Sequence, residues 1–391
     1  MKSRLLAVQG PLQFIAGLLA MEWYKKIKDS SEESKSVLLM YDFLAPESIE
    51  PELFEVITRM ASVRVWHSVV FISSNDMGSI MKGSYSSSIR RLCDTIGEYD
   101  FDEIYLARDF CGHGSPLIIN AYRNANKIIY GDSLGVVGNE AGINSFNWHS
   151  PATSVLSVCK RLLREWLYGA PDRLQFNAAV LTLPIVCSNG YLDDVPLFIP
   201  RIDFVVSTIE SVYQKLSNLS DYCDSLIRLA GESNCLLFLL SNLNGSGLMT
   251  KEKEIALYVE IINETAVKGS SIFLKAHPRD SGEVLDAIVD RLHANFKIIV
   301  IDDARLSRIP IELWAGLIES CRVIPIFSTS AINLKYIYRK SVWLPLNEEL
   351  VRRYFFKGKI SYILANNHLV SKSIENLDIW DGNSLLFEST L

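Results

Sequence analysis

Three cationic or proton-donating side chains stand close together in the stretch FLKAHPRD, residues 273–280. The apolar residues before them are typical of a strand, and Pro278 ends that strand directly after a histidine. The strand end therefore presents Lys275, His277 and Arg279 at the position where α/β domains bind ligands. This combination suits an anionic phosphate group. A solvated strand end with an incidental histidine is the alternative.

Three consecutive hydroxyl side chains form a second candidate site. Ser328, Thr329 and Ser330 lie between an apolar strand and a helical pattern. Their hydroxyls and the N–H groups at the start of the helix can hold a phosphate. Ordinary helix capping needs only one such residue. The run therefore favours a ligand over a simple cap.

Asp132 is the acid placed best for proton transfer in the first half of the chain. It follows the apolar strand residues 127–130, lies between Gly131 and Gly135, and has Ser133 beside it. A carboxylate on a glycine-flanked turn at a strand end can act as a general base. It can equally be a simple turn acid. The stretch matches neither GxGxxG nor a Walker A loop, which excludes those nucleotide sites.

The remaining acids give weaker indications. Glu312 follows Pro310 by two residues and falls in the first turn of a predicted helix, where an acid is favourable for electrostatic reasons alone. Asp100 and Asp102 have the DxD spacing of metal-dependent transferases but precede a predicted strand, which favours a solvated strand entry. We find no convincing set of metal ligands and expect no metal.

Composition excludes several classes of protein. The 391 residues include 49% hydrophobic residues, which predicts a folded protein with two domains or one large one. The net charge of −6 comes without a basic block, which argues against nucleic-acid binding. None of the seven cysteines forms a CxxC pair, as expected of reduced thiols in a cytoplasmic protein. No stretch reaches the roughly 18 apolar residues of a membrane span.

Short apolar runs alternate with amphipathic stretches, which predicts βαβ units around parallel sheets. The expected strands are Arg4–Val8, Ser36–Tyr41, Ser68–Ser73, Glu103–Ala107, Lys127–Tyr130, Ala178–Leu183, Leu197–Ile199, Cys235–Ser241, Ser271–Lys275, Phe296–Ile301, Arg322–Phe327 and Ser341–Leu344. The expected helices are Leu12–Ile27, Pro51–Ala61, Pro116–Ala125, Phe204–Leu229, Lys251–Thr265, Ser281–His293, Ile311–Ser320 and Ala331–Ile337. Two such sets in succession predict two Rossmann-like domains facing a cleft.

Taken together, these motifs occur in the same order in bacterial sialyltransferases. The series begins with the strand-turn-helix stretch VQGPLQFIAGLLA at residues 8–20 and continues through the glycine-flanked acid to the Ser/Thr run. The chain resembles the polysialyltransferase-like group and its relatives among the lipooligosaccharide sialyltransferases, over roughly residues 5–344. The resemblance implies an α/β protein of GT-B fold with two Rossmann-like domains. We expect an N-terminal acceptor domain at 1–230, a C-terminal donor domain at 231–350, and a segment 351–391 that packs back on the first domain.

The resemblance also implies roles for individual residues. The general base would be Asp132, although the family has two acids before glycine and this chain keeps one. His277 matches the family's His-Pro motif and would stabilise the leaving phosphate. The acid of the Pro-x-Glu motif, here Glu312, contacts the ribose, and Thr329-Ser330 or Ser328-Thr329 holds the phosphate. The expected donor-binding residues are Lys275, Pro278, Glu312, Ser328, Thr329 and Ser330. The expected cleft residues are Gly10, Gly131, Ser133 and His113.

The implied activity is an inverting transfer of sialic acid from CMP-sialic acid to a sugar hydroxyl of a bacterial surface polysaccharide or lipo-oligosaccharide. The expected partners are the CMP-sugar donor and a glycan acceptor that can be lipid-linked, with no cofactor and no nucleic acid. Any membrane association would be peripheral, at the inner face of the cytoplasmic membrane. The alternatives are a transferase that uses legionaminate, Kdo or another nucleotide sugar, and a non-catalytic sugar-nucleotide-binding protein.

Overall fold

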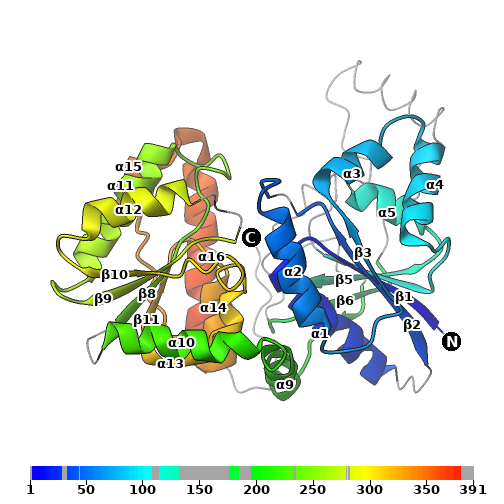
Figure 1. Cartoon of the computed structure of the whole chain (residues 1–391), viewed down its shortest axis with the longest axis horizontal. Helices are drawn as coiled ribbons and strands as arrows, with labels where there is room; N and C mark the ends of the chain where they lie inside the picture. The colour runs from blue at the N-terminus through cyan, green and yellow to red at the C-terminus, as the bar shows by residue number, and fades with distance from the viewer. Residues whose placement is uncertain are drawn as a thin grey trace. The chain divides into compact units, whose positions relative to one another are not determined.

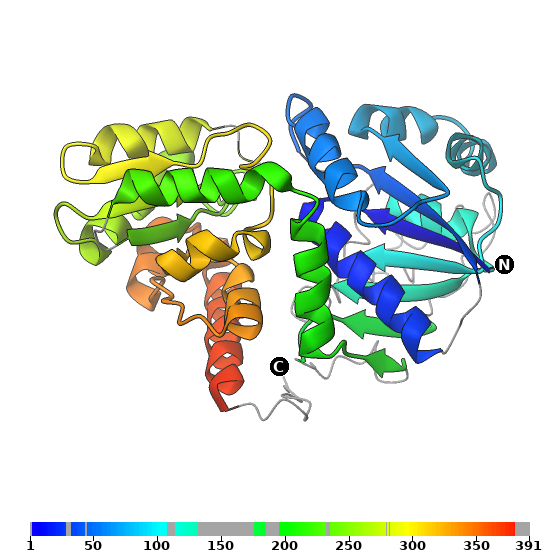
Figure 2. The ribbon, with the colours of Figure 1, turned by 60° about the horizontal axis from the view of Figure 1, so that its bottom comes forward.

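The computed structural model describes residues 2–28, 33–43, 45–107, 114–131, 176–184, 195–231, 235–278, 280 and 282–379. The chain forms two compact units (Figure 1). Unit 1 contains the described residues of Met1–Leu44 and Arg64–Val205, and unit 2 contains those of Ala45–Val63 and Val206–Leu386. Both units have helices on the faces of a parallel sheet, as Figure 2 shows.

Unit 1 is built on a sheet of parallel strands in the order β3-β2-β1-β4-β5-β6-β7. The strands are β1 (Lys2–Val8), β2 (Ser34–Tyr41), β3 (Ser68–Ile72), β4 (Glu103–Ala107), β5 (Asn126–Gly131), β6 (Ala178–Leu181) and β7 (Leu197–Phe198). The helices are α1 (Pro11–Ile27), α3 (Ser74–Ile80), α4 (Tyr85–Ile96) and α5 (Ser115–Ala121). The central strands are apolar and buried along most of their length because helices cover both faces.

A glycine lets α1 approach the sheet closely. A Cβ atom at Gly17 would lie 2.5 Å from Cδ1 of Leu6 and 3.0 Å from the ring of Tyr130. The hydroxyl of Tyr130 donates a 2.7 Å hydrogen bond to the carbonyl of Ala7 in β1. This packing holds the first half of α1 against the sheet.

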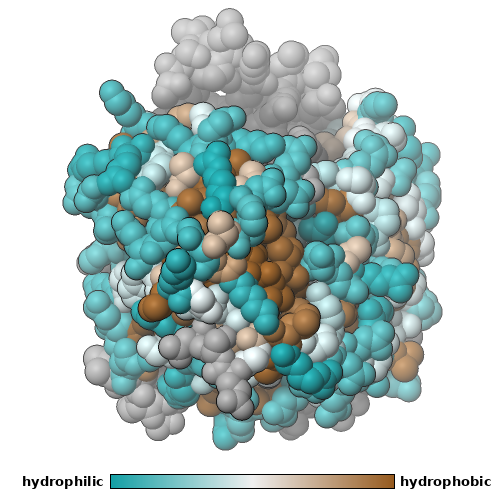
Figure 3. All heavy atoms as spheres, turned by 60° about the vertical axis from the view of Figure 1, so that its left-hand side comes forward, coloured by the Kyte–Doolittle hydropathy of each residue, from teal (hydrophilic) through white to brown (hydrophobic). Residues whose placement is uncertain are grey.

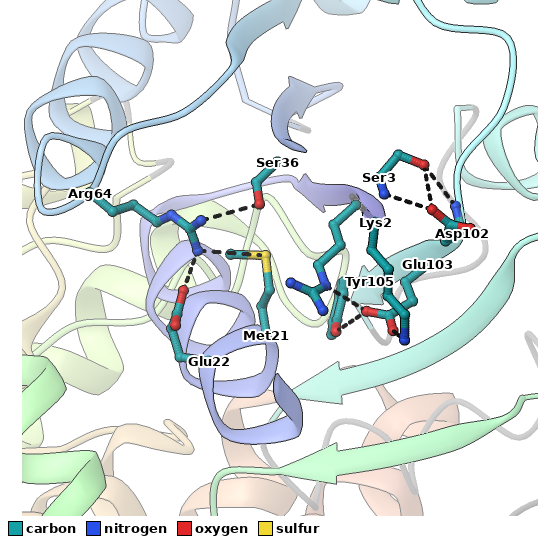
Figure 4. A network of polar contacts seen from close by, with 10 residues as sticks. Lys2, Ser3, Met21, Glu22, Ser36, Arg64, Asp102, Glu103 and Tyr105 are labelled. Carbon is teal, nitrogen blue, oxygen red and sulfur yellow. Dashed lines mark hydrogen bonds and ion pairs between the residues drawn. The ribbon is translucent and has the colours of Figure 1, made fainter. Parts of the chain in front are cut away.

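A buried ion pair joins β1 to β4 near the amino ends of these strands (Figure 4). Arg4 and Glu103 face each other in the parallel register, and Nε of Arg4 lies 2.8 Å from Oε2 of Glu103. The hydroxyl of Tyr105 donates to the same carboxylate oxygen at 2.9 Å. Removing the Glu103 carboxylate would leave Arg4 buried without its partner, so the pair is compatible only with a register that places these two residues side by side.

Unit 2 is built on a parallel sheet in the order β10-β9-β8-β11. The strands are β8 (Cys235–Leu239), β9 (Ser271–Lys275), β10 (Lys297–Val300) and β11 (Arg322–Pro325). The helices are α2 (Glu50–Ala61), α10 (Ser217–Ala230), α11 (Lys251–Thr265), α12 (Glu283–Leu292), η1 (Ile311–Leu313), α13 (Ala315–Ser320), α14 (Ser330–Tyr338), α15 (Glu348–Tyr354), η2 (Lys357–Lys359) and α16 (Ile360–Ile379), and α9 (Ile202–Tyr213) crosses the boundary between the units. One core contains residues of α11, α12, α15 and α16, while α10 packs on α13 and β10.

The predicted α/β fold with two Rossmann-like units is confirmed, since each unit has a parallel sheet with helices on its faces. The boundaries differ from the prediction in places. The expected helix 204–229 is divided at residues 214–216 into α9 and α10, and the expected strand 341–344 contributes only the bridge between Val323 and Val342. Helices α3 and α4 were not predicted.

The two units also divide the chain differently from the expected domains. The first boundary lies after residue 205 and not after 230, because α10 packs on elements of unit 2. The described part of the segment expected to pack back on the first domain lies in unit 2, where α16 contacts α14 and Ile363 joins the core. Residues 45–63 lie in unit 2 as well.

The surface seen in Figure 3 is mainly polar, with a smaller apolar area near its middle. Large exposed apolar side chains of unit 2 include Val267, Leu229 and Tyr362. Among the described residues, no helix combines the length and the apolar character that a bilayer span requires.

Replacing Arg4 by Met should lower the free energy of unfolding by about 3–5 kcal/mol, because the buried carboxylate of Glu103 then keeps only the half-exposed ammonium of Lys2 as a counter-charge. The double variant Arg4→Met/Glu103→Leu should recover most of this loss. Lys2→Met is the matched control, since the Lys2 side chain is 42% exposed and lies 3.8 Å from the same carboxylate, and its loss should cost about 0–1 kcal/mol. Urea denaturation measures all three, and equal losses for Arg4→Met and Lys2→Met would show that the buried pair has no special weight.

Candidate active site

The motifs predicted in unit 2 lie at one edge of its sheet. The strands are parallel, so the loops that follow β8, β9, β10 and β11 all leave from their carboxyl ends. β9 and β10 lie on one side of β8 and β11 lies on the other, so the strand order reverses between β8 and β11. Ligands of α/β sheets bind outside the carboxyl ends of the strands at such a reversal.

The turn between β11 and α14 contains a residue in an uncommon backbone conformation. Phe327 has φ of 52°, in the left-handed region that bulky side chains rarely adopt. The hydroxyl of Ser241, after β8, lies 2.5 Å from the carbonyl oxygen of Ile326 and 3.1 Å from that of Phe327. The ring of Phe327 packs edge-on against Phe355. These contacts hold the turn in place, and strain of this kind gathers at functional sites.

The three consecutive hydroxyl residues 328–330, the hydroxyl run, follow this turn directly. Ser330 is the first residue of α14, and its N–H donates to Oγ of Ser328 at 3.2 Å. Thr329 is the N-cap residue, yet its side chain makes no capping hydrogen bond. All three residues are partly exposed. The arrangement therefore offers hydroxyls beside the N-terminus of a helix, which favours an anionic ligand.

Glu312 joins the Pro-x-Glu motif to the hydroxyl run. Its side chain is buried, and Oε1 accepts a 2.8 Å hydrogen bond from Nδ2 of Asn333. The hydroxyl of Ser330 also bonds to this carboxylate. Burial raises the pKa of Glu312, while the hydrogen bonds from Asn333 and Ser330 and the charge of Lys275 act in the opposite direction. In this structure the carboxylate positions the first turn of α14.

Lys275 ties the end of β9 to the loop that follows β10. Its side chain is 4% exposed, and Nζ donates a 2.6 Å hydrogen bond to the carbonyl of Ser307. The ammonium group lies 5.6 Å from the centre of the Trp314 ring. Burial lowers the pKa of Lys275 to about 7, although the negative charge of Glu312 opposes this shift. Lys275, which the sequence predicts to bind a phosphate, therefore forms its hydrogen bond with the protein itself.

The loop of His277 and Pro278 is held by an arginine that the sequence analysis did not single out. Nη1 of Arg308 donates to the carbonyls of Pro278 at 2.9 Å and Asp280 at 3.2 Å. Its Nε donates to Oε2 of Glu52 in α2 at 2.8 Å. His277 is partly exposed, and its carbonyl accepts from the N–H of Asp280 at 2.9 Å. Arg308 therefore fixes the backbone that presents His277.

A second unpredicted group supports the loop after β8. Oε1 and Oε2 of Glu254 accept hydrogen bonds from the N–H groups of Leu243 and Asn244, both at 2.9 Å. Tyr258, one turn further along α11, donates through its hydroxyl to the carbonyl of Ser241 at 2.6 Å. Both side chains are buried. The spacing of four residues on a helix would have indicated their common face, but no sequence pattern marks them as loop supports.

The candidate residues of unit 1 are only partly described. Gly10 connects β1 to α1 with an extended backbone, φ of 171°. Gly131 ends β5 with φ of 149°, and its carbonyl accepts from the N–H and the hydroxyl of Thr182. The other unit 1 candidates, His113, Asp132 and Ser133, lie outside the described residues, as does Arg279 of unit 2. In the described part, the structure therefore brings together the motifs of unit 2.

The segment that contains this site matches the sequence model of a known protein family. Residues 203–343 match the sequence model of the alpha-2,8-polysialyltransferase (POLYST) family. A search of curated proteins finds no match to the chain. The resemblance to polysialyltransferases is confirmed over the matched segment, and it supports a glycosyltransferase of sialyltransferase type.

Several solved structures are similar to the chain at low identity. The sialyltransferase GT-B domain from Photobacterium damselae is 12% identical with a TM-score of 0.47, and the alignment covers 94% of this chain and 97% of that one. The UDP complex of MnaA from S. aureus is 10% identical with a TM-score of 0.49, covering 100% and 93%. A 2,6-sialyltransferase from a Photobacterium species, in a ternary complex with CMP and lactose, is 11% identical with a TM-score of 0.44, covering 95% and 77%.

Replacing Arg308 by Ala should release the backbone around His277, because the carbonyls of Pro278 and Asp280 lose a charged donor. Hydrogen exchange of the amides in 276–282 should become roughly tenfold faster or more. Arg305→Ala is the matched control, since Arg305 pairs with Glu55 of the same helix α2 at 3.2 Å but is 66% exposed. Mass spectrometry of deuterium uptake makes the comparison. Equal rates in both variants would contradict the role given to Arg308.

Lys275 should make the stability of the protein depend on pH. Its pKa is about 7 in the folded protein and near 10.5 when unfolded, so the unfolded chain binds an extra proton between these values. The free energy of unfolding should therefore rise as the pH increases from 7 to 10. Urea titrations of wild type and Lys275→Met test this, and the variant should lose this part of the rise. The same pH profile in both proteins would show that the lysine is not buried as described.

Proposed function

We propose that the protein transfers sialic acid from CMP-sialic acid to a sugar hydroxyl of a bacterial surface polysaccharide or lipo-oligosaccharide, with inversion at the anomeric carbon. One observation carries the proposal. The hydrogen bonds of Glu312 with Ser330 and Asn333 join two separate motifs at the carboxyl edge of the sheet, inside the segment that matches the polysialyltransferase family.

The donor would bind to unit 2 through its phosphate. Hydroxyls of Ser328, Thr329 and Ser330 lie beside the first turn of α14, where the helix dipole favours negative charge. Lys275 and Pro278 would act through the loop backbone, because Nζ of Lys275 bonds to Ser307 and the carbonyl of Pro278 bonds to Arg308. These contacts support a preformed phosphate site that the donor enters without rebuilding the loops.

The reaction would be a direct displacement. The acceptor hydroxyl forms a bond to the anomeric carbon of sialic acid as the bond from that carbon to the phosphate oxygen breaks. Asp132 would take the hydroxyl proton, and His277 would stabilise or protonate the leaving phosphate. A monophosphate carries less charge than a diphosphate, so these donors can neutralise it without a metal ion. The proposed reaction therefore needs no cofactor.

His277→Ala should lower the rate of CMP-sialic acid hydrolysis in the absence of acceptor by roughly 10²–10³-fold, because the leaving phosphate loses its stabilising group. His293→Ala is the matched control, since His293 is an exposed residue at the C-terminus of α12. Release of CMP measures both rates. Equal rates for the two variants would contradict the role of His277.

A panel of donors separates the proposed function from the alternatives. Turnover of CMP-legionaminate or CMP-Kdo in place of CMP-sialic acid would change the donor and keep the chemistry. Turnover of a nucleotide sugar without CMP would exclude both CMP donors. Binding of CMP without turnover, unchanged in Asp132→Ala, would indicate a sugar-nucleotide-binding protein. An Asp132→Ala variant that binds CMP normally but is inactive would support the transferase.

A further inference from the structure

Two buried oxygen atoms lie at the carboxyl edge of the unit 1 sheet. Gln9 directly follows β1 and Asp42 directly follows β2, and these strands are parallel neighbours. The Gln9 residue is 0% exposed and Asp42 is 3% exposed. Among the described residues, neither Oε1 of Gln9 nor Oδ2 of Asp42 has a hydrogen-bond partner. Buried polar atoms are nearly always paired in proteins, so each of these needs an explanation.

Hydrogen bonds from neighbouring atoms of the same two residues hold their side chains in place. Nε2 of Gln9 donates to the carbonyl of Asp42 at 3.3 Å, and the N–H of Gln9 donates to Oε1 of Gln13 at 2.8 Å. Oδ1 of Asp42 accepts from the hydroxyl of Ser74 at 3.3 Å. The N–H of Asp42 donates to the carbonyl of Ile72 at 3.2 Å. The two unpartnered oxygens therefore sit on residues that the fold itself holds.

Asp42 is also in an uncommon backbone conformation. Its φ of 40° lies in the left-handed region, and it is one of the few residues other than glycine with positive φ in the described part of the chain. The residues around it pack closely, since a Cβ atom at Gly114 would lie 2.8 Å from the ring of Tyr41 and from Cε of Met77. Strain held by tight packing is characteristic of ligand-binding positions.

The position in the sheet is the one where ligands bind. β2 and β3 lie on one side of β1, while β4 to β7 lie on the other, so the strand order reverses at β1. The crevice outside the carboxyl ends at such a reversal is the usual binding place in α/β sheets. Gln9 stands at this point. Unpaired polar atoms, strain and topology thus coincide at one edge of unit 1.

We propose that Gln9 and Asp42 form a subsite that accepts hydrogen bonds from two hydroxyl groups of a sugar. An amide oxygen and a carboxylate oxygen can only accept, so the ligand must bring donors, and neighbouring hydroxyls of a sugar ring supply two. The source is the acceptor glycan or the sugar of the donor, an assignment that rests on the proposed function. The subsite itself is inferred from the two unpartnered oxygen atoms, and its test does not depend on the proposed function.

The test replaces Asp42 by Asn, which keeps the size and tolerates positive φ but can turn an acceptor into a donor. Asp76→Asn is the matched control, because it makes the same change at an acid in the first turn of α3 in the same unit. With wild type as reference, Asp42→Asn should raise the KM for the sugar about tenfold or more and leave the melting temperature unchanged or higher. A higher KM for lactose would identify the acceptor, and a higher KM for CMP-sialic acid the donor.

Binding measured without turnover separates this inference from the proposed function. Lactose, free sialic acid and oligosialic acid are titrated by ligand-observed NMR against wild type and both variants. Binding to wild type and Asp76→Asn but not to Asp42→Asn supports the subsite even if no CMP-sugar is turned over. Equal binding to all three proteins, or binding to none, overturns it. A crystal structure with each of these sugars that shows only a water molecule between the two oxygens also overturns it.

Discussion

The buried carboxylate of Glu312 connects the parts of the candidate site, because it accepts hydrogen bonds from another segment of the chain. Glu312 accepts hydrogen bonds from Nδ2 of Asn333 and the hydroxyl of Ser330. The short helix η1 and the first turn of α14 therefore cannot move independently. A buried carboxylate without such donors would be strongly unfavourable. The same residues that satisfy Glu312 thereby place the hydroxyl run at the carboxyl edge of the sheet.

Other buried groups extend this arrangement to each neighbouring loop. Lys275 bonds to the loop after β10, Arg308 bonds to the loop after β9, and Glu254 bonds to the loop after β8. Each contact joins a charged side chain to backbone groups that the sheet leaves unpaired at its edge. These side chains therefore fix the shape of the loops through contacts within the protein, which is the kind of preorganisation that electrostatic stabilisation requires.

The sequence was sufficient for the parts of the fold that depend on local pattern. Lys251–Thr265, Ser271–Lys275 and Glu103–Ala107 have the predicted bounds, because caps, apolar runs and turn residues act within a few positions. The break at 214–216 and the packing of residues 45–63 with unit 2 depend on contacts distant in sequence, and no local pattern reports them.

The same distinction holds for the site. Glu312 and Ser330 were both singled out from the sequence, but their hydrogen bond joins residues 18 positions apart and appears only in the fold. Arg308 and Glu254 were not singled out, since a residue that supports a backbone carries no motif of its own. Lys275 was predicted as a phosphate ligand from its type, and only the structure shows its bond to the carbonyl of Ser307.

The proposed function requires unit 2 to hold a nucleotide monophosphate at the start of α14. The most direct measurement is a crystal structure of the protein soaked with CMP. We expect the phosphate within hydrogen-bond distance of the Ser328–Ser330 run, on the same edge of the sheet as His277. CMP bound elsewhere on unit 2, or a site at α14 left empty while CMP binds in solution, would contradict it.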